Sequence, residues 1–243
     1  MRTRLLIFFL MLFCFVSVGF GYKYETSVKR TFPIKPDGIV RLTTLRGNIE
    51  ISTHSDSDIT IKATIMSDDR SEIDKIKINF EAGADSVIVT SNGKLAKSKV
   101  DIDYYLKIPV NLKSLHVTTR SGEIEARGTY GNIDLNTTNG EIDFRGGFTG
   151  CKLNSANGDI DIYMKDTLKG DISAKSTNGS IEISLKSGSG FTIDGSSITG
   201  SIRSEFNTTI GRDLTGFKIK GTVESGTYKI VLRTVNGDLN LIR

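Results

Sequence analysis

Acidic side chains recur at fixed positions within a repeated motif. In each copy a Gly is followed by a polar residue, an Ile or Leu, a second polar residue and a second apolar residue. The copies are TRSGEIEA (119–126), TTNGEIDF (137–144), SANGDIDI (155–162), STNGSIEI (176–183) and TVNGDLNL (234–241). If each motif formed a strand and the strands stacked, the outward carboxylates would lie about 4.8 Å apart. The candidate ligand-binding residues are therefore Glu123, Glu141, Asp143, Asp159, Asp161 and Glu182.

Calcium is one candidate ligand for such a carboxylate ladder. Like charges on neighbouring strands repel, so solvent and salt, nearby lysines or a bound cation must offset them. Ca²⁺ prefers several hard oxygens, which this ladder offers. The sequence lacks the GGxGxDxx nonapeptide of calcium-binding rolls, and a solvated strand face screened by salt is the favoured interpretation. We expect no cofactor and assign no metal ligands.

A polysaccharide hydrolase or lyase is the alternative function for these acids. A glycosidase needs two carboxyl groups on either side of the scissile bond, usually in a cleft. No pair in the motifs is singled out, and a regular ladder lacks the differentiated pocket that would push two pKa values apart. The chain has no Trp that could serve as a sugar platform. We therefore predict a non-enzymatic protein without catalytic residues.

The remaining reactive residue types form no constellation. His54 and His116 are the only histidines, and their separation fits no metal-ligand spacing. Cys151 follows Gly150 at the start of an expected strand, where a small buried residue is the simplest interpretation. Cys14 lies in the apolar N-terminal run, so Cys151 is expected to be the single Cys of the mature chain.

The elements that position the acids are read from the glycine spacing. Gly122, Gly140, Gly158, Gly179, Gly200 and Gly237 follow one another at steps of 18, 18, 21, 21 and 37 residues. A weaker glycine series lies between them, so each unit of about 20 residues holds two short strands. The spacing predicts an all-β, right-handed parallel β-solenoid. An antiparallel sandwich of hairpins is the alternative, because Asn-Gly is also the strongest two-residue hairpin signal.

Strict alternation of polar and apolar residues predicts one buried face for each strand. In a sequential stack, one continuous buried ladder would consist of Ile124, Ile142, Ile160, Ile181 and Ile202. Further strands are expected at 58–65, 86–90 and 99–108, with an insertion or short helix within 66–80. The expected organisation is a signal peptide (1–21), an N-terminal lead-in (22–34) and one solenoid domain (35–243).

The N-terminus has the layout of a secretory signal peptide. Arg2 and Arg4 precede an apolar run over 5–20, and Gly19 and Gly21 supply small residues before a cleavage point. An uncleaved membrane anchor is the alternative. Removing this segment takes two of the 32 basic residues and none of the 28 acidic ones, which leaves 30 − 28 = +2. So small an excess gives no reason to expect nucleic acid or an anionic membrane as partner.

The chain resembles the DUF4097-type family of bacterial adhesin domains. The resemblance is carried by LRGNIEI (45–51), LKIP (106–109), VTTRSGEIEA (117–126) and the NG-D/E-I repeats that follow. It covers roughly residues 35–243 and implies a β-solenoid fold in an exported or membrane-associated protein. The resemblance brings no catalytic motif with it.

These observations together predict an exported scaffold or binding protein of the cell envelope or surface. It would be periplasmic, surface-bound or extracellular, and would present a repetitive polar face to an envelope protein or a surface polysaccharide. We expect no membrane insertion after signal cleavage. The chain ends at Arg243 inside a repeat, which would leave an open solenoid edge. Unpaired strand edges invite pairing with another chain, so this edge predicts a homodimer.

Overall fold

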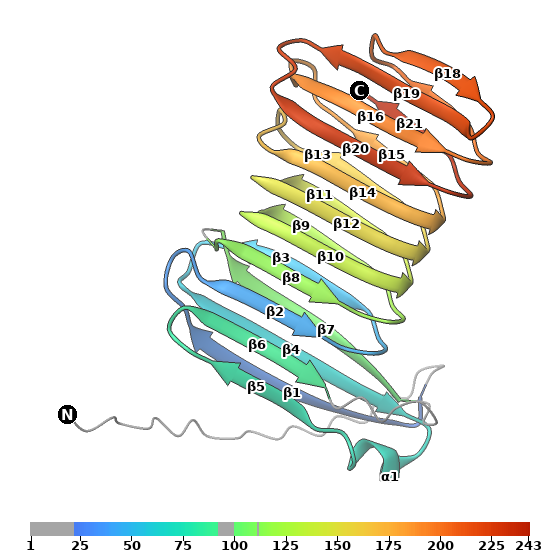
Figure 1. The fold of residues 1–243 in the computed structure, drawn as a ribbon. Coiled ribbons are helices and arrows are strands. Elements are labelled where there is room, and N and C mark those ends of the chain that lie inside the picture. The colour runs from blue at the N-terminus through green and yellow to red at the C-terminus, as the bar shows by residue number, and fades with distance from the viewer. Residues whose placement is uncertain (1–21, 92–99, 111) are drawn as a thin grey trace.

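Successive strands alternate between two sheets along most of the chain (Figure 1). The computed structural model describes residues 22–91, 100–110 and 112–243. Sheet I has ten strands and sheet II eleven, so the predicted all-β fold is confirmed. Within the described residues no helix is long and apolar enough to cross a membrane. The predicted signal peptide lies outside the described residues.

The repeat region is a stack of two-strand coils. Its strands are β8 (Ser114–Thr118), β9 (Ile124–Thr129), β10 (Asn132–Asn139), β11 (Ile142–Gly147), β12 (Gly150–Asn157), β13 (Ile160–Met164), β14 (Asp171–Asn178) and β15 (Ile181–Ser184). Even-numbered members lie in sheet II and odd-numbered members in sheet I. Each pairs in parallel with its equivalent in the next coil. Each repeat unit thus holds two strands, as predicted, and the hairpin alternative is wrong for this region.

The buried ladder runs in a different order from the sequence at its C-terminal end. Ile124, Ile142, Ile160 and Ile181 are paired in turn and fully buried. The next partner of Ile181 is Leu239, and Ile202 follows beyond it. Strand β21 (Leu239–Ile242) lies between β15 and β17 (Ile202–Ser204), and β20 (Tyr228–Thr234) lies between β14 and β16 (Phe191–Ser197). The expectation of strictly sequential stacking is therefore wrong for the last coils.

This insertion changes the predicted C-terminal edge. The last strand, β21, is paired on both sides. The outermost strands at this end are β17 in sheet I and β18 (Thr209–Asp213) in sheet II. Strand β18 pairs antiparallel with β19 (Gly216–Val223), which pairs antiparallel with β16. An antiparallel hairpin, and not the end of the chain, therefore forms the sheet II edge.

The N-terminal end combines parallel and antiparallel pairing. Strands β2 (Ile39–Thr43) and β3 (Ile49–His54) join the repeat stack in parallel. Strands β6 (Ser86–Ser91) and β7 (Val100–Pro109) lie outside them. The end is completed by antiparallel β1 (Tyr24–Pro33), β4 (Asp58–Ser67) and β5 (Ile78–Ala82). The strands predicted at 58–65, 86–90 and 99–108 thus correspond to β4, β6 and β7. The helix expected within 66–80 is α1 (Arg70–Ile73).

The Asn-Gly part of the motif holds the coils together. A Cβ added to Gly140 would lie 2.0 Å from the carbonyl oxygen of Gly122 in the preceding coil, so only glycine fits there. The Asn157 amide donates to Asn139 Oδ1 at 2.8 Å and accepts from Asn178 at 2.7 Å. The Ser155 hydroxyl donates to the Gly140 carbonyl at 2.9 Å. The recurring geometry of these turns is therefore scaffolding, and surface chemistry is left to the residues that follow the glycine.

Candidate functional site

Five carboxylates form a continuous row across the outer face of sheet I. Each stands between two buried apolar residues of its strand, so the alternation directs it outward. Strand registers place the five directly beside one another, and Asn240 of β21 continues the row. This acidic row consists of Glu50, Glu125, Asp143, Asp161 and Glu182.

The six predicted ligand-binding residues divide between two positions. Asp143, Asp161 and Glu182 belong to the acidic row. Glu123, Glu141 and Asp159 instead occupy the position directly after the turn glycine. Glu123 and Glu141 are exposed.

Asp159 has a structural partner in the next coil. Its Oδ1 accepts a hydrogen bond from the Ser180 backbone N–H at 2.7 Å. The same contact recurs further along the stack, where Asp238 Oδ1 accepts from the Ser201 backbone N–H at 2.7 Å. An aspartate at the position after the glycine therefore caps the start of the neighbouring strand.

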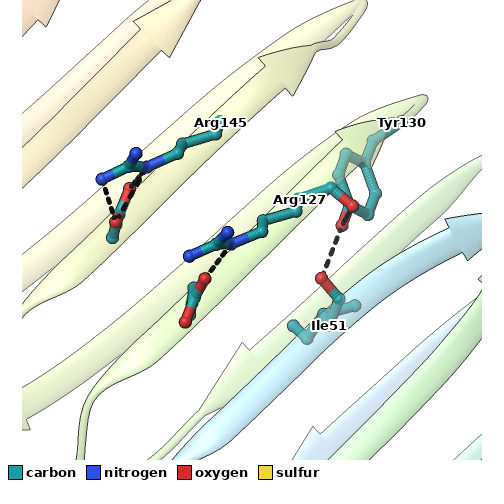
Figure 2. A network of polar contacts seen from close by, with 6 residues as sticks. Ile51, Arg127, Tyr130 and Arg145 are labelled. Carbon is teal, nitrogen blue, oxygen red and sulfur yellow. Dashed lines mark hydrogen bonds and ion pairs between the residues drawn. The ribbon is translucent and has the colours of Figure 1, made fainter.

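Arginines neutralise only part of the acidic row (Figure 2). On β9, Arg127 bonds to Glu125 two residues before it. On β11, Arg145 pairs with Asp143 at 3.0 Å in the same way. The register places Tyr163 on β13 and Ser184 on β15 at the equivalent positions. Asp161 and Glu182 therefore have no arginine on their own strands, and the same holds for Glu50, whose strand has Ser52 at this position.

Tyr130 connects the strands that carry Arg127 and Arg145 to the neighbouring strand β3. Its ring is buried against Phe144, with ring centroids 5.8 Å apart. Its hydroxyl lies 3.0 Å from the Arg127 carbonyl oxygen and 3.2 Å from the Ile51 carbonyl oxygen (Figure 2). Burial raises the pKa of the Tyr130 hydroxyl, so it stays neutral and available as a donor. The backbone that carries Arg127 is thus tied to β3 through Tyr130.

Asp161 is electrostatically distinct from an isolated surface aspartate. Asp161 is an exposed residue of β13, yet neighbouring side chains partly desolvate its carboxyl, and Glu182, Asp143 and Asp159 add like charge around it. These effects raise the pKa of Asp161 from 3.8 to about 6. A proton or a cationic group of a ligand would relieve the repulsion. Negative charge is therefore concentrated in the row around Asp161.

Glu50 and Glu125 belong to the acidic row although they are absent from the predicted set. Both occupy the same phase of the motif as Asp143, within LRGNIEI and SGEIEA. That phase would have identified them. The same phase places Arg127 and Arg145 two residues after their acids, and Tyr163 and Ser184 at that position in the next two motifs.

A second cluster lies in the turn between β3 and β4. His54, Asp56 and Asp58 bring one ligand atom each to within 4.8 Å of one another. His54 Nδ1 lies 3.4 Å from Asp56 Oδ2, and it accepts a hydrogen bond from the Asp56 backbone N–H at 3.2 Å. The separation of His54 from His116 was the only spacing considered for a metal site, and the H-x-D-x-D spacing of residues 54–58 was missed. His116 lies elsewhere, with Nδ1 3.8 Å from Asp134.

Cys151 faces the interior, as predicted, and is 5% exposed. Burial, and secondarily the charge of Asp134, raises the pKa of its thiol well above the usual value. The reactive form of a cysteine is the thiolate. Cys151 therefore belongs to the core and not to a site.

The family model described as Toastrack DUF4097 matches residues 31–242. Among solved structures, a "putative cell adhesion protein" from Clostridium sporogenes is 12% identical with a TM-score of 0.49, over 88% of this chain and 98% of that one. A "putative adhesin" from Bacteroides fragilis is 13% identical with a TM-score of 0.44, over 89% and 97%. No curated protein matches the sequence. Identities this low transfer no ligand or partner to this chain.

Proposed function

The chain belongs to the Toastrack DUF4097 family, and we propose that it acts as an exported, non-catalytic scaffold of the cell envelope or surface. In this role it binds a polymer or protein partner along the polar outer face of sheet I. Export is supported by the basic start, apolar run and small-residue exit of residues 1–21.

The acidic row is the single observation that carries this proposal. It repeats one chemical group at the strand spacing of about 4.8 Å. Such a row complements a partner that carries amines or guanidinium groups along an extended chain. A ligand of this kind would be held by many weak, repeated contacts on a rigid backbone. The residues proposed for binding are the six predicted acids, joined by Glu50 and Glu125.

A polysaccharide-active enzyme is the second candidate, and the pKa of Asp161 favours it. Acid catalysis in glycosidases uses one carboxyl whose pKa is raised beside another that stays ionised. Asp161, with a pKa of about 6, fits the first role. The row lies on an open strand face, however, whereas a glycosidase encloses the scissile bond between two differentiated carboxyl groups. Binding without cleavage is therefore the preferred function.

One experiment separates the two functions. The protein is incubated with chitosan, peptidoglycan and neutral and acidic polysaccharides, in calcium or in chelator, and gel filtration then reports polymer length and protein elution. Co-elution with an amine-bearing polymer at unchanged length supports the scaffold. Shortening of a polymer would contradict it and support the enzyme. Loss of co-elution in chelator would show that a cation on the row takes part.

Matched variants locate the interaction. The triple variant Asp143→Asn, Asp161→Asn, Glu182→Gln removes three charges from the acidic row and is expected to abolish co-elution. Asp68→Asn, Asp85→Asn, Asp166→Asn removes the same charge from exposed positions elsewhere and should leave it unchanged. Equal losses in the two variants would argue against the row.

We further propose right-handed winding and self-association through the C-terminal edge. Parallel strands joined by a crossover connect right-handedly in nearly all proteins.

Strand β18 is the outermost strand of sheet II, all its residues are exposed, and Ile210 is 42% exposed. An unprotected edge of this kind favours pairing with a second copy. Sedimentation should show a dimer that Ile210→Lys weakens, and a monomer at high concentration would contradict the pairing.

A further inference from the structure

A groove crosses the outer face of sheet II near one corner of the coils. It has a volume of about 580 Å³ and is lined by residues of β10, β12, β14, β20 and β16. These five strands are neighbours in the sheet. At about 4.8 Å per strand, the groove extends roughly 19 Å along the stack, perpendicular to the strands. Its shape suits a linear chain that lies along the solenoid.

One wall of the groove is polar and carries positive charge. Strand registers align Asn136, Asn154, Lys175 and Arg233 in one row. The Asn154 amide donates to Asn136 Oδ1 at 2.7 Å, and the Asn136 amide donates to Asp134 at 2.9 Å. This chain of donors leaves the Asn154 Oδ1 available as an acceptor.

The two cations of this wall differ in how they are held. Lys175 is exposed and has no ion pair or hydrogen bond with any described residue. The Arg233 guanidinium donates to the Asp194 carbonyl at 2.6 Å and lies 3.1 Å from the Asp194 carboxylate. Lys175 therefore supplies a free charge, while Arg233 supplies a fixed one that Asp194 partly balances.

The other wall lies two residues further along each strand, where two large apolar side chains stand beside Ala156 and Thr177. Val235 follows Arg233 on this outward side and is 37% exposed. Ile198 follows Ser196 of β16 and is 53% exposed. These two exposed side chains share one groove and so offer a ligand an apolar contact surface. The groove is therefore amphipathic across its width.

We propose that this groove binds a segment of a linear acidic polysaccharide. Sugar rings present C–H faces that would pack on Val235 and Ile198. Their hydroxyls would donate to Asn154 Oδ1, and their carboxylates would accept from Lys175 and Arg233. Charged hydrogen bonds of this kind are the stronger ones. The chemistry of the two walls thus matches the two chemical characters of a uronic-acid chain.

An acidic peptide fits the groove less well. Extended peptides commonly bind by adding a strand to a free sheet edge, where main-chain groups pair with it. The groove instead runs across strands whose backbone groups are already paired with their neighbours. A polysaccharide needs no backbone ladder. The geometry therefore favours a glycan over a peptide.

This site is separate from the acidic row, because it lies on the other sheet and has the opposite charge. A negative binding result at one surface therefore does not contradict the proposal for the other. Lys175→Glu reverses the free charge of the groove without touching sheet I. Lys62→Glu makes the same change at an exposed position of β4 in sheet I, and so serves as the matched control.

The test is calorimetric titration of the purified protein with oligogalacturonate in EDTA, with neutral dextran and poly-glutamate as comparison polymers. We expect oligogalacturonate to bind, and dextran and poly-glutamate not to bind. Lys175→Glu should weaken the affinity for oligogalacturonate at least tenfold, and Lys62→Glu should weaken it less than twofold. Val235→Ser should also weaken it, which separates contact with the apolar wall from attraction of charge. Thermal unfolding of each variant checks that it is folded.

Three results would overturn the proposal. No binding of oligogalacturonate would do so directly. Equal losses in the two lysine variants would show attraction to overall charge and not to the groove. Equal binding of poly-glutamate would show that the groove accepts any extended polyanion, including an acidic peptide.

Discussion

Ile181 pairs directly with Leu239, although Ile202 is much nearer in sequence. Ile202 pairs with the opposite side of Leu239. The segment that carries Leu239 thus lies inside the stack and completes both sheets, with β21 in sheet I and β20 in sheet II. Stability of the C-terminal coils should therefore depend more on the last residues of the chain than on the coil around Ile202.

Leu239→Ala is expected to lower the free energy of unfolding by about 3 kcal/mol, within the range for emptying a packed core position. Leu239 is fully buried between two strands, whereas Ile202 is 8% exposed on an edge strand. Ile202→Ala should cost at least about 1 kcal/mol less, because an edge can relax into the space. Urea unfolding of the two variants measures the difference. Equal costs would contradict the inserted order.

Gly140→Ala is expected to lower the free energy of unfolding by about 3 kcal/mol, at the upper end for overpacking a close contact. The added Cβ would lie 2.0 Å from a backbone oxygen of the adjacent coil, which cannot move without disturbing the ladder. Gly147→Ala is the control, since its Cβ would meet nothing nearer than 4.0 Å. Thermal unfolding should separate the two variants clearly. Similar melting temperatures would show that the turns tolerate a side chain.

Asn157→Ala is expected to lower the free energy of unfolding by about 1 kcal/mol, because it removes two hydrogen bonds of the asparagine ladder and a longer one to the Thr138 carbonyl. Asn207→Ala is the control, since the described residues give the exposed Asn207 side chain no hydrogen bond. Denaturant midpoints of the two variants provide the comparison. If Asn207→Ala lowered the free energy of unfolding as much as Asn157→Ala, the hydrogen bonds of the ladder would not account for the loss.

The repeat predicted the parallel coils and the buried isoleucines, because period and phase are local properties of the sequence. The order of the outer coils was not predictable in this way. Motifs with the same apolar phase can pair with one another in any order, and Leu239 fits beside Ile181 as well as Ile202 would. The groove of sheet II escaped prediction for the same reason. Its charged wall joins Lys175 to Arg233 only because β20 lies beside β14.

The acidic row shows the same division between local and spatial information. The outward phase of Asp143, Asp161 and Glu182 follows from alternation within each strand. Their unequal electrostatic environments follow only in part, because they depend on the acids of the neighbouring coils as well as on the side chain two residues along the strand. Arg145 forms an ion pair with Asp143, whereas Tyr163 offers Asp161 no ion pair on its own strand.

Asp161→Asn is expected to raise the melting temperature at pH 7.5 and to leave it nearly unchanged at pH 4. The pKa of Asp161 is about 6 in the folded protein and 3.8 without the fold. Between these values the folded state holds the proton more tightly than the unfolded state, so native stability falls as pH rises from about 4 to 6 and stays lower above it. The amide side chain of the variant cannot ionise and therefore avoids that loss.

The direct measurement is an NMR titration of the Asp161 carboxyl carbon, with a midpoint expected near pH 6. Asp68→Asn, at an exposed position away from the row, is the control and should show no such pH-dependent gain. A midpoint near pH 4, or a gain of equal size in the two variants, would contradict the raised pKa. A ligand amine bound at the acidic row should lower the midpoint again, because a neighbouring cation favours the ionised carboxyl. The same titration therefore reports on the electrostatics of the row and on its occupation.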